Sequence, residues 1–96
     1  MPQSAIVIDE RDNVATALGH LEAGVTIRVE IGGEAQDVAL RQTIPMGHKF
    51  ALRSIEPGEP VIKYGEVVGL ATKKILNGEH AHVHNVEGPK GRRYQE

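Results

Sequence analysis

Residues 25–33 read Val-Thr-Ile-Arg-Val-Glu-Ile-Gly-Gly, and this stretch decides the class of fold. Its aliphatic side chains recur at every second position with polar side chains between them, which is the period of a β-strand that buries one face. The two glycines that follow can adopt the positive φ angles of a tight hairpin turn. Val38 and Leu40 then resume the alternation. Residues 25–41 are therefore predicted to form an antiparallel hairpin.

Outside this hairpin, one turn pattern recurs three times. Each copy has an aliphatic residue, two linking residues, a glycine and then a resumed strand, and the copies begin at Leu21, Ile55 and Ile75. We interpret the aliphatic residue as an anchor in the core and the glycine as the point where the chain reverses. Frequent short strands with glycine turns predict an all-β domain, either barrel-like or a folded sheet.

The segment 13–21 is ambiguous between helix and strand. Val14, Leu18 and Leu21 have helical spacing, whereas Val14, Thr16 and Leu18 alternate as in a strand. Asp12 could cap a helix, but we favour the strand.

One short helical turn and a tail complete the expected organisation. Pro45 removes a backbone donor and breaks the strand pattern, after which residues 50–52 are expected to form a short helical turn. No linker interrupts the chain before about residue 88. We therefore expect one β domain over residues 1–87 and a flexible C-terminal tail over residues 88–96.

Composition limits the classes of function. The chain has 96 residues with one Phe, two Tyr and no Trp, so aliphatic side chains must build a thin core. The absence of cysteine excludes disulfides, thiolate metal sites and a cysteine nucleophile, and it fits a reducing compartment. A net charge of −2 with few aromatic residues does not indicate a nucleic-acid partner. The apolar run near the N-terminus, residues 5–8, is too short for a signal peptide or a membrane span, so we expect a soluble cytoplasmic protein without a membrane partner.

Three histidines alternate near the end of the chain. If the backbone is extended there, the imidazoles of His80, His82 and His84 project from one face, where two of them could ligate one divalent metal. Alternatively, they are surface or subunit-contact residues. Asn85 either holds an imidazole or bonds the backbone in a turn, and we favour the turn.

Two further segments could contact an anionic substrate. Gly47 precedes His48 and Lys49, a cationic pair that can meet a carboxylate, with histidine also able to move a proton near neutral pH. The alternative is that His48 caps a turn and Lys49 faces solvent. Lys63 and Tyr64 are either an anion-binding pair or a snorkelling lysine beside an edge tyrosine, and the residues alone favour the second interpretation.

At these segments the sequence resembles the N-terminal SAF-type domain of altronate and galactarate dehydratases. The resemblance runs from about Ile6 to Val86 and implies a β-clip fold. The matching stretches are residues 12–15, 47–52, 61–69 and 78–85.

The resemblance implies the small subunit, or the N-terminal domain, of a metal-dependent hydro-lyase that dehydrates a sugar acid such as altronate. A large catalytic subunit would carry most of the active site and hold most of the contacts to Fe2+ or Mn2+. The expected site residues are His48 and Lys49 for catalysis, Lys63 and Tyr64 for substrate binding, and His82 and His84 near the metal.

Two alternative functions stay open. The small subunit of sulfolactate sulfo-lyase is similar in the same Gly-His-Lys, Lys-Tyr-Gly and His-Val-His-Asn stretches. SAF-type domains also serve as carbohydrate-binding modules without catalysis, although few aromatic side chains are present here to stack on sugars.

Overall fold

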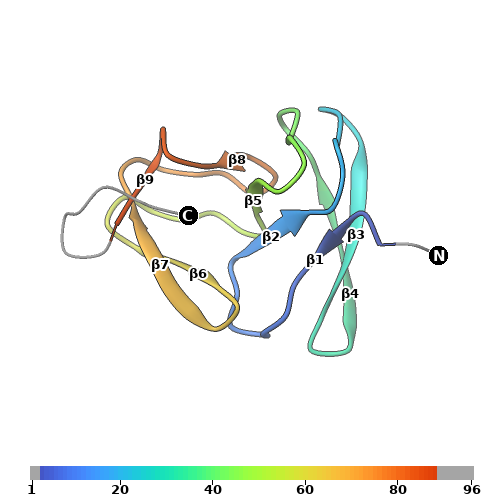
Figure 1. The fold of residues 1–96 in the computed structure, drawn as a ribbon, viewed down its shortest axis with the longest axis horizontal. Coiled ribbons are helices and arrows are strands. Elements are labelled where there is room, and N and C mark those ends of the chain that lie inside the picture. The colour runs from blue at the N-terminus through green and yellow to red at the C-terminus, as the bar shows by residue number, and fades with distance from the viewer. Residues whose placement is uncertain (1–2, 89–96) are drawn as a thin grey trace.

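The computed structural model describes residues 3–88, and within that range it contains nine β-strands and no helix. The strands form three antiparallel sheets, ordered β1-β2-β5-β8, β3-β4 and β6-β7-β9 (Figure 1). This confirms the all-β prediction. Since no helix occurs, the described residues also contain none that could cross a membrane. The strands are β1 (Ala5–Ile6), β2 (Val14–Ala17), β3 (Thr26–Ile31), β4 (Glu34–Ala39), β5 (Lys49–Ala51), β6 (Pro60–Lys63), β7 (Glu66–Ala71), β8 (His80–Ala81) and β9 (Val86–Glu87).

The hairpin predicted from the opening stretch is β3 and β4, paired in unbroken register. Gly32 and Gly33 have φ angles of 59° and 85°, as expected for a two-residue type I′ turn. Ile27 and Val29 are buried while the polar residues between them are exposed, which confirms the alternation. Val25 is the exception, because it lies just before the strand and is exposed.

A second hairpin, β6 and β7, closes with the same kind of turn. Tyr64 and Gly65 lie at its tip with φ angles of 56° and 77°. The sequence signal for this hairpin is weaker, because tyrosine rarely adopts a positive φ. In the structure, the register of the pairing also shifts between Val61 and Ile62. The two hairpins make the two halves of the chain similar.

The turn pattern occurs four times, not three. The fourth copy begins at Ile44 and ends at Gly47. The first residues of the copies form isolated bridges in pairs, Leu21 with Ile44 and Ile55 with Ile75. In all four copies the glycine has a φ of 83–88°. Each hairpin is therefore enclosed by two such turns.

Strands β2 and β5 lie at the centre of the four-stranded sheet. The ambiguous segment 13–21 contains β2, so the favoured strand is confirmed. The helical turn predicted for residues 50–52 is wrong, because Lys49–Ala51 are extended and pair with β2 on one side and β8 on the other. Pairing on both sides satisfies the backbone donors and acceptors that an isolated helical turn would leave open.

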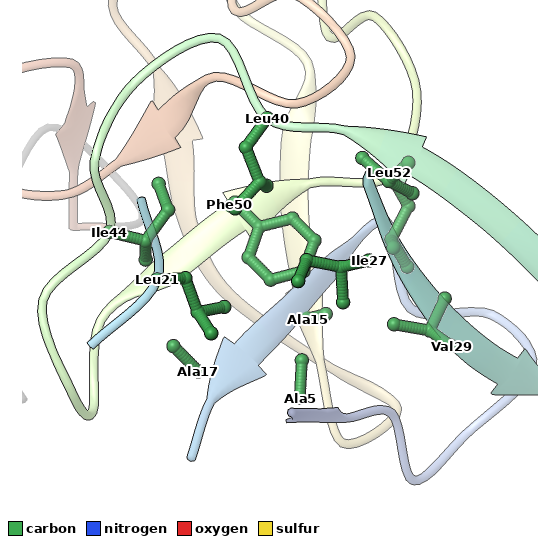
Figure 2. Packing of buried hydrophobic residues seen from close by; sticks show 11 residues of the cluster. Ala5, Ala15, Ala17, Leu21, Ile27, Val29, Leu40, Ile44, Phe50 and Leu52 are labelled. Carbon is green, nitrogen blue, oxygen red and sulfur yellow. The ribbon is translucent and has the colours of Figure 1, made fainter. Parts of the chain in front are cut away.

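The buried side chains form two separate clusters. Figure 2 shows the first cluster, where Phe50 lies among aliphatic side chains from β1, β2, β3 and the turns. Ala51, the next residue of β5, belongs to the second cluster around Ile55, Val61 and Ile75. Since successive side chains of a strand point to opposite faces, β5 is shared by both cores. The predicted tail, residues 88–96, lies outside the described residues except for Gly88, and its flexibility stays a prediction.

Candidate functional site

Four histidines, His48, His80, His82 and His84, gather where β5 meets β8, and we call them the histidine cluster. Nδ1 of His48 lies 2.8 Å from Nε2 of His80, so one ring donates a hydrogen bond to the other. The rings of His48 and His82 are stacked, with centroids 3.9 Å apart and an interplanar angle of 16°. The ring of His84 is tilted by 38° against that of His80 at 5.1 Å. The first three rings are partly buried and His84 is exposed.

The pairing of β5 with β8 brings the first two rings together. Phe50 lies opposite His80 in the register, so His48 ends the turn just before the paired segment. The backbone N–H of His48 donates to the carbonyl of Pro45, and its carbonyl accepts from Ala17 in β2. His48 thus follows a turn, as one alternative held, and its ring is also directed at the histidines of β8.

A turn, not an extended strand, places the other two rings. Strand β8 ends at Ala81, and the N–H groups of Asn85 and Val86 both donate to the carbonyl of His82. The premise that this segment is extended through all three histidines is therefore wrong. Asn85 is 1% exposed; its Oδ1 accepts from the backbone of His82, and its Nδ2 donates to the carbonyl of His80. The favoured turn role of Asn85 is confirmed.

Burial and neighbouring charges keep the ring of His80 neutral. Burial is the largest cause, followed by the rings of His84, His48 and His82 and by the charge of Lys49, and together they lower the pKa of His80 to about 4. Lys49 is completely buried in β5, so the alternative that it faces solvent is wrong. The structure places it close enough to the histidine cluster to repel a positive charge there.

Lys63 and Tyr64 are not brought to the histidine cluster. They lie at the tip of the β6–β7 hairpin, at the lower edge of Figure 1, whereas β8 lies at the upper edge. The ammonium of Lys63 is 5.0 Å from the centre of the Tyr64 ring, a cation–π contact within the turn. The N–H of Gly65 donates to the buried carboxylate of Asp12 at 2.8 Å.

Two residues that precede β2 anchor this second hairpin. Asn13 is 1% exposed, accepts at Oδ1 from the N–H of Ile62 and donates from Nδ2 to the carbonyl of Pro60. Asp12 contacts the tip of the same hairpin. Asp12 and Asn13 therefore contribute to the fold of the domain by holding the second hairpin.

Three of the clustered rings offer nitrogen atoms close together. One ligand nitrogen each from His48, His80 and His82 lies within 4.8 Å of the others. Of the metal residues expected from the sequence, this group includes His82 but not His84, and it adds His80 and His48, the latter expected for catalysis. The fourth copy of the turn is the sequence signal that could have identified His48 as a neighbour of His80. Lys49 and His80 each lie two residues after a turn glycine, and each begins one of two neighbouring strands.

Comparison with known proteins gives one family and several related enzymes. The chain matches the family described as altronate/galactarate dehydratase SAF domain over residues 3–89. It is 46% identical over 80 residues to altronate dehydratase of Escherichia coli (strain K12), which covers 83% of this chain and 15% of that protein. It is 46% identical over 48 residues to (2R)-sulfolactate sulfo-lyase subunit alpha of Chromohalobacter salexigens, half of each chain (50% and 51%). It is 35% identical over 75 residues to galactarate dehydratase (L-threo-forming) of Escherichia coli (strain K12), covering 76% of this chain and 13% of that protein. The chain thus spans only a small part of the dehydratases that it matches.

Proposed function

The chain belongs to the altronate/galactarate dehydratase SAF domain family, and from this premise we propose that it is the small subunit, or N-terminal domain, of a metal-dependent hydro-lyase. The substrate in this proposal is a sugar acid such as altronate, and a large catalytic subunit supplies most of the active site. Its relatives are dehydratases and a sulfo-lyase subunit, which supports a lyase as the general class. The absence of cysteine is consistent with a cytoplasmic enzyme.

The sulfo-lyase relative supports the subunit arrangement. Its 48 aligned residues make up 51% of that subunit, so the matching region forms half of a separate, short subunit. Its name, subunit alpha, also indicates an enzyme with more than one kind of subunit. A SAF domain can therefore be one chain of such an assembly, and this favours a large partner here.

The observation that carries the proposal is the histidine cluster beside a buried lysine. Removing the proton α to a carboxylate builds a second negative charge on that carboxylate, which fixed positive charge or a metal must stabilise. Lys49 supplies a fixed charge in β5, and the partly exposed ring of His48 can contact the carboxylate or carry the proton. Both clusters of buried side chains are small, and in this proposal the partner subunit closes the site around the substrate.

Fe2+ or Mn2+ supplies Lewis-acid chemistry in this proposal and is held mainly by the large subunit. His82 and His84 were expected near that metal, and imidazole is a suitable ligand for iron. The ring of His84 packs on His80 and is exposed, so it is available to a metal or a partner outside this chain.

Turnover of the reconstituted complex tests the role of His48. We expect His48→Ala to lower kcat by roughly 100-fold or more, the usual contribution of a positioned acid or base. His20→Ala is the matched control, because His20 is an exposed histidine that pairs with Glu22 in a separate loop. Unchanged turnover in His48→Ala would remove this residue from the site. Sugar-acid dehydration by the purified chain alone would contradict the subunit role.

Sulfolactate is the second candidate substrate, favoured by the 46% identity to the sulfo-lyase subunit over 48 residues. Product analysis with altronate, galactarate and sulfolactate separates the two lyase activities. Binding of neutral glycans by the isolated chain would instead support a carbohydrate-binding module.

A further inference from the structure

We propose that His48, His80 and His82 form a site for one divalent transition-metal ion that this chain builds by itself. One ligand nitrogen from each ring lies within 4.8 Å of the others. This set differs from the pair expected from the sequence, and it needs neither the proposed reaction nor a partner subunit. It can therefore be tested on the isolated chain.

The distances are close to those of a bound metal. With metal–nitrogen bonds of about 2.0–2.1 Å, nitrogens of a tetrahedral site lie roughly 3.3 Å apart. The cluster brackets this separation, since His48 and His80 are 2.8 Å apart and all three nitrogens lie within 4.8 Å. A metal would replace the hydrogen bond between the first two rings, and each neutral imidazole can keep its proton on the other nitrogen.

The rings must tilt before they can share one ion. Their planes are nearly parallel, with angles of 10–19° between them, whereas ligand lone pairs lie in the ring planes and have to converge. The torsion that turns an imidazole has broad minima, so tilting costs little. All three rings are partly exposed, which leaves space for this movement.

The backbone beneath the rings is already fixed. His48 lies directly before β5, which pairs Phe50 with His80, and its own backbone bonds Pro45 and Ala17. The side chain of Asn85 bonds the backbone of both His80 and His82. A metal therefore orders little additional chain, and this preorganisation favours binding.

The donor set indicates which metals bind. Three imidazoles without a carboxylate favour Co, Ni, Cu and Zn over Mn and Mg, which prefer oxygen ligands. The buried Lys49 opposes a second positive charge nearby, so affinity should be lower than in a site without such a neighbour. Three protein ligands leave at least one position on the ion open to water or to a carboxylate oxygen.

Metal titration of the full chain, purified without a polyhistidine tag, tests the site. We expect Zn2+ and Co2+ to bind at one ion per chain by calorimetry, with Co2+ giving visible absorption bands, and Mn2+ to bind far more weakly. Loss of a residue that hydrogen-bonds a metal ligand lowers metal affinity by roughly 10- to 100-fold. Loss of a ligand itself, in His48→Asn or His82→Asn, should therefore lower the affinity by at least about 100-fold.

Two histidines outside the three-ligand set provide controls. His20→Asn should leave affinity unchanged, and His84→Asn should weaken it less than either ligand variant does, since His84 packs on His80 but is not one of the three ligands. Circular dichroism confirms that each variant is folded. The site is disproved if wild type does not saturate at one Zn2+, if His48→Asn or His82→Asn binds like His20→Asn, or if His84→Asn loses as much affinity as they do. Metal binding without turnover in the complex would count against the proposed reaction alone.

Discussion

At the scale of single residues, the histidine cluster depends on Asn85, whose amide bonds two backbone groups. It is buried and satisfies the N–H of His82 and the carbonyl of His80. A buried backbone group without a hydrogen-bond partner has lost its hydration and gains nothing in return. Deleting this amide should therefore lower the free energy of unfolding more than deleting an exposed hydrogen bond does. The spacing of the histidines does not reveal this role of Asn85. Their alternation suggests a strand, whereas the Asn85 amide stabilises a turn after Ala81.

We expect Asn85→Ala to lower the free energy of unfolding by about 2 kcal/mol, because two buried backbone groups lose their partner. Urea denaturation measures the change. Asn77→Ala is the control, since Asn77 is exposed and its carbonyl, which the substitution keeps, is the group that accepts from Arg41. Equal stability of the two variants would show that the Asn85 amide does not hold the turn.

A second prediction concerns Tyr64, which adopts a positive φ of 56° in a type I′ turn. Asparagine is preferred at this position, so Tyr64→Asn should raise stability by up to about 1 kcal/mol even though the contact with Lys63 is lost. Because the turn lies away from the histidine cluster, turnover of the reconstituted complex should not change. Thermal unfolding and steady-state kinetics measure the two effects. A large rise in KM would instead assign Tyr64 to substrate binding.

At the scale of elements, local patterns predicted the first hairpin but not the central strand. Residues 25–33 carry both the alternation and the Gly-Gly turn, so local sequence is sufficient. Strand β5 has three residues and gains its extended conformation from partners far away in the chain. The fourth turn was also missed, since Pro45, which has no backbone donor, indicated a break in the strand pattern and not a further copy of the turn. The contact between His48 and His80 depends on these two elements, and for this reason the sequence did not predict which histidines lie together.

The four turns allow a matched test of glycine. Gly58 and Gly78 have φ angles of 85° and 88°, so alanine at either position adopts a conformation that costs roughly 1–2 kcal/mol. At Gly58 a Cβ atom would meet nothing within 4 Å, whereas at Gly78 it would collide with the carbonyl oxygen of Ala39. Gly78→Ala should therefore be clearly less stable than Gly58→Ala in urea denaturation. Equal losses would mean that the backbone at Ala39 can move away freely.

At the scale of the whole molecule, the two halves share β5. Phe50 packs in the first core and Ala51 in the second. If one core unfolds, β5 loses the packing on one of its faces, which also weakens the other core. A domain with such thin cores gains stability mainly when both form together. The histidine cluster lies at the same strand, so its geometry depends on both halves.

This sharing predicts a single cooperative unfolding transition. Phe50→Leu in the first core and Ile55→Val in the second should each lower the free energy of unfolding by about 1 kcal/mol, because each leaves unfilled space among buried side chains. Amide hydrogen exchange at Val29 and Val61, which report on the first and second cores, should accelerate together in both variants. Val67→Ala, at a half-exposed position of β7, should change stability by less than about 0.5 kcal/mol. If Phe50→Leu accelerated exchange only at Val29, the halves would unfold independently, and a partner bound at the histidine cluster would then have to stabilise two units instead of one.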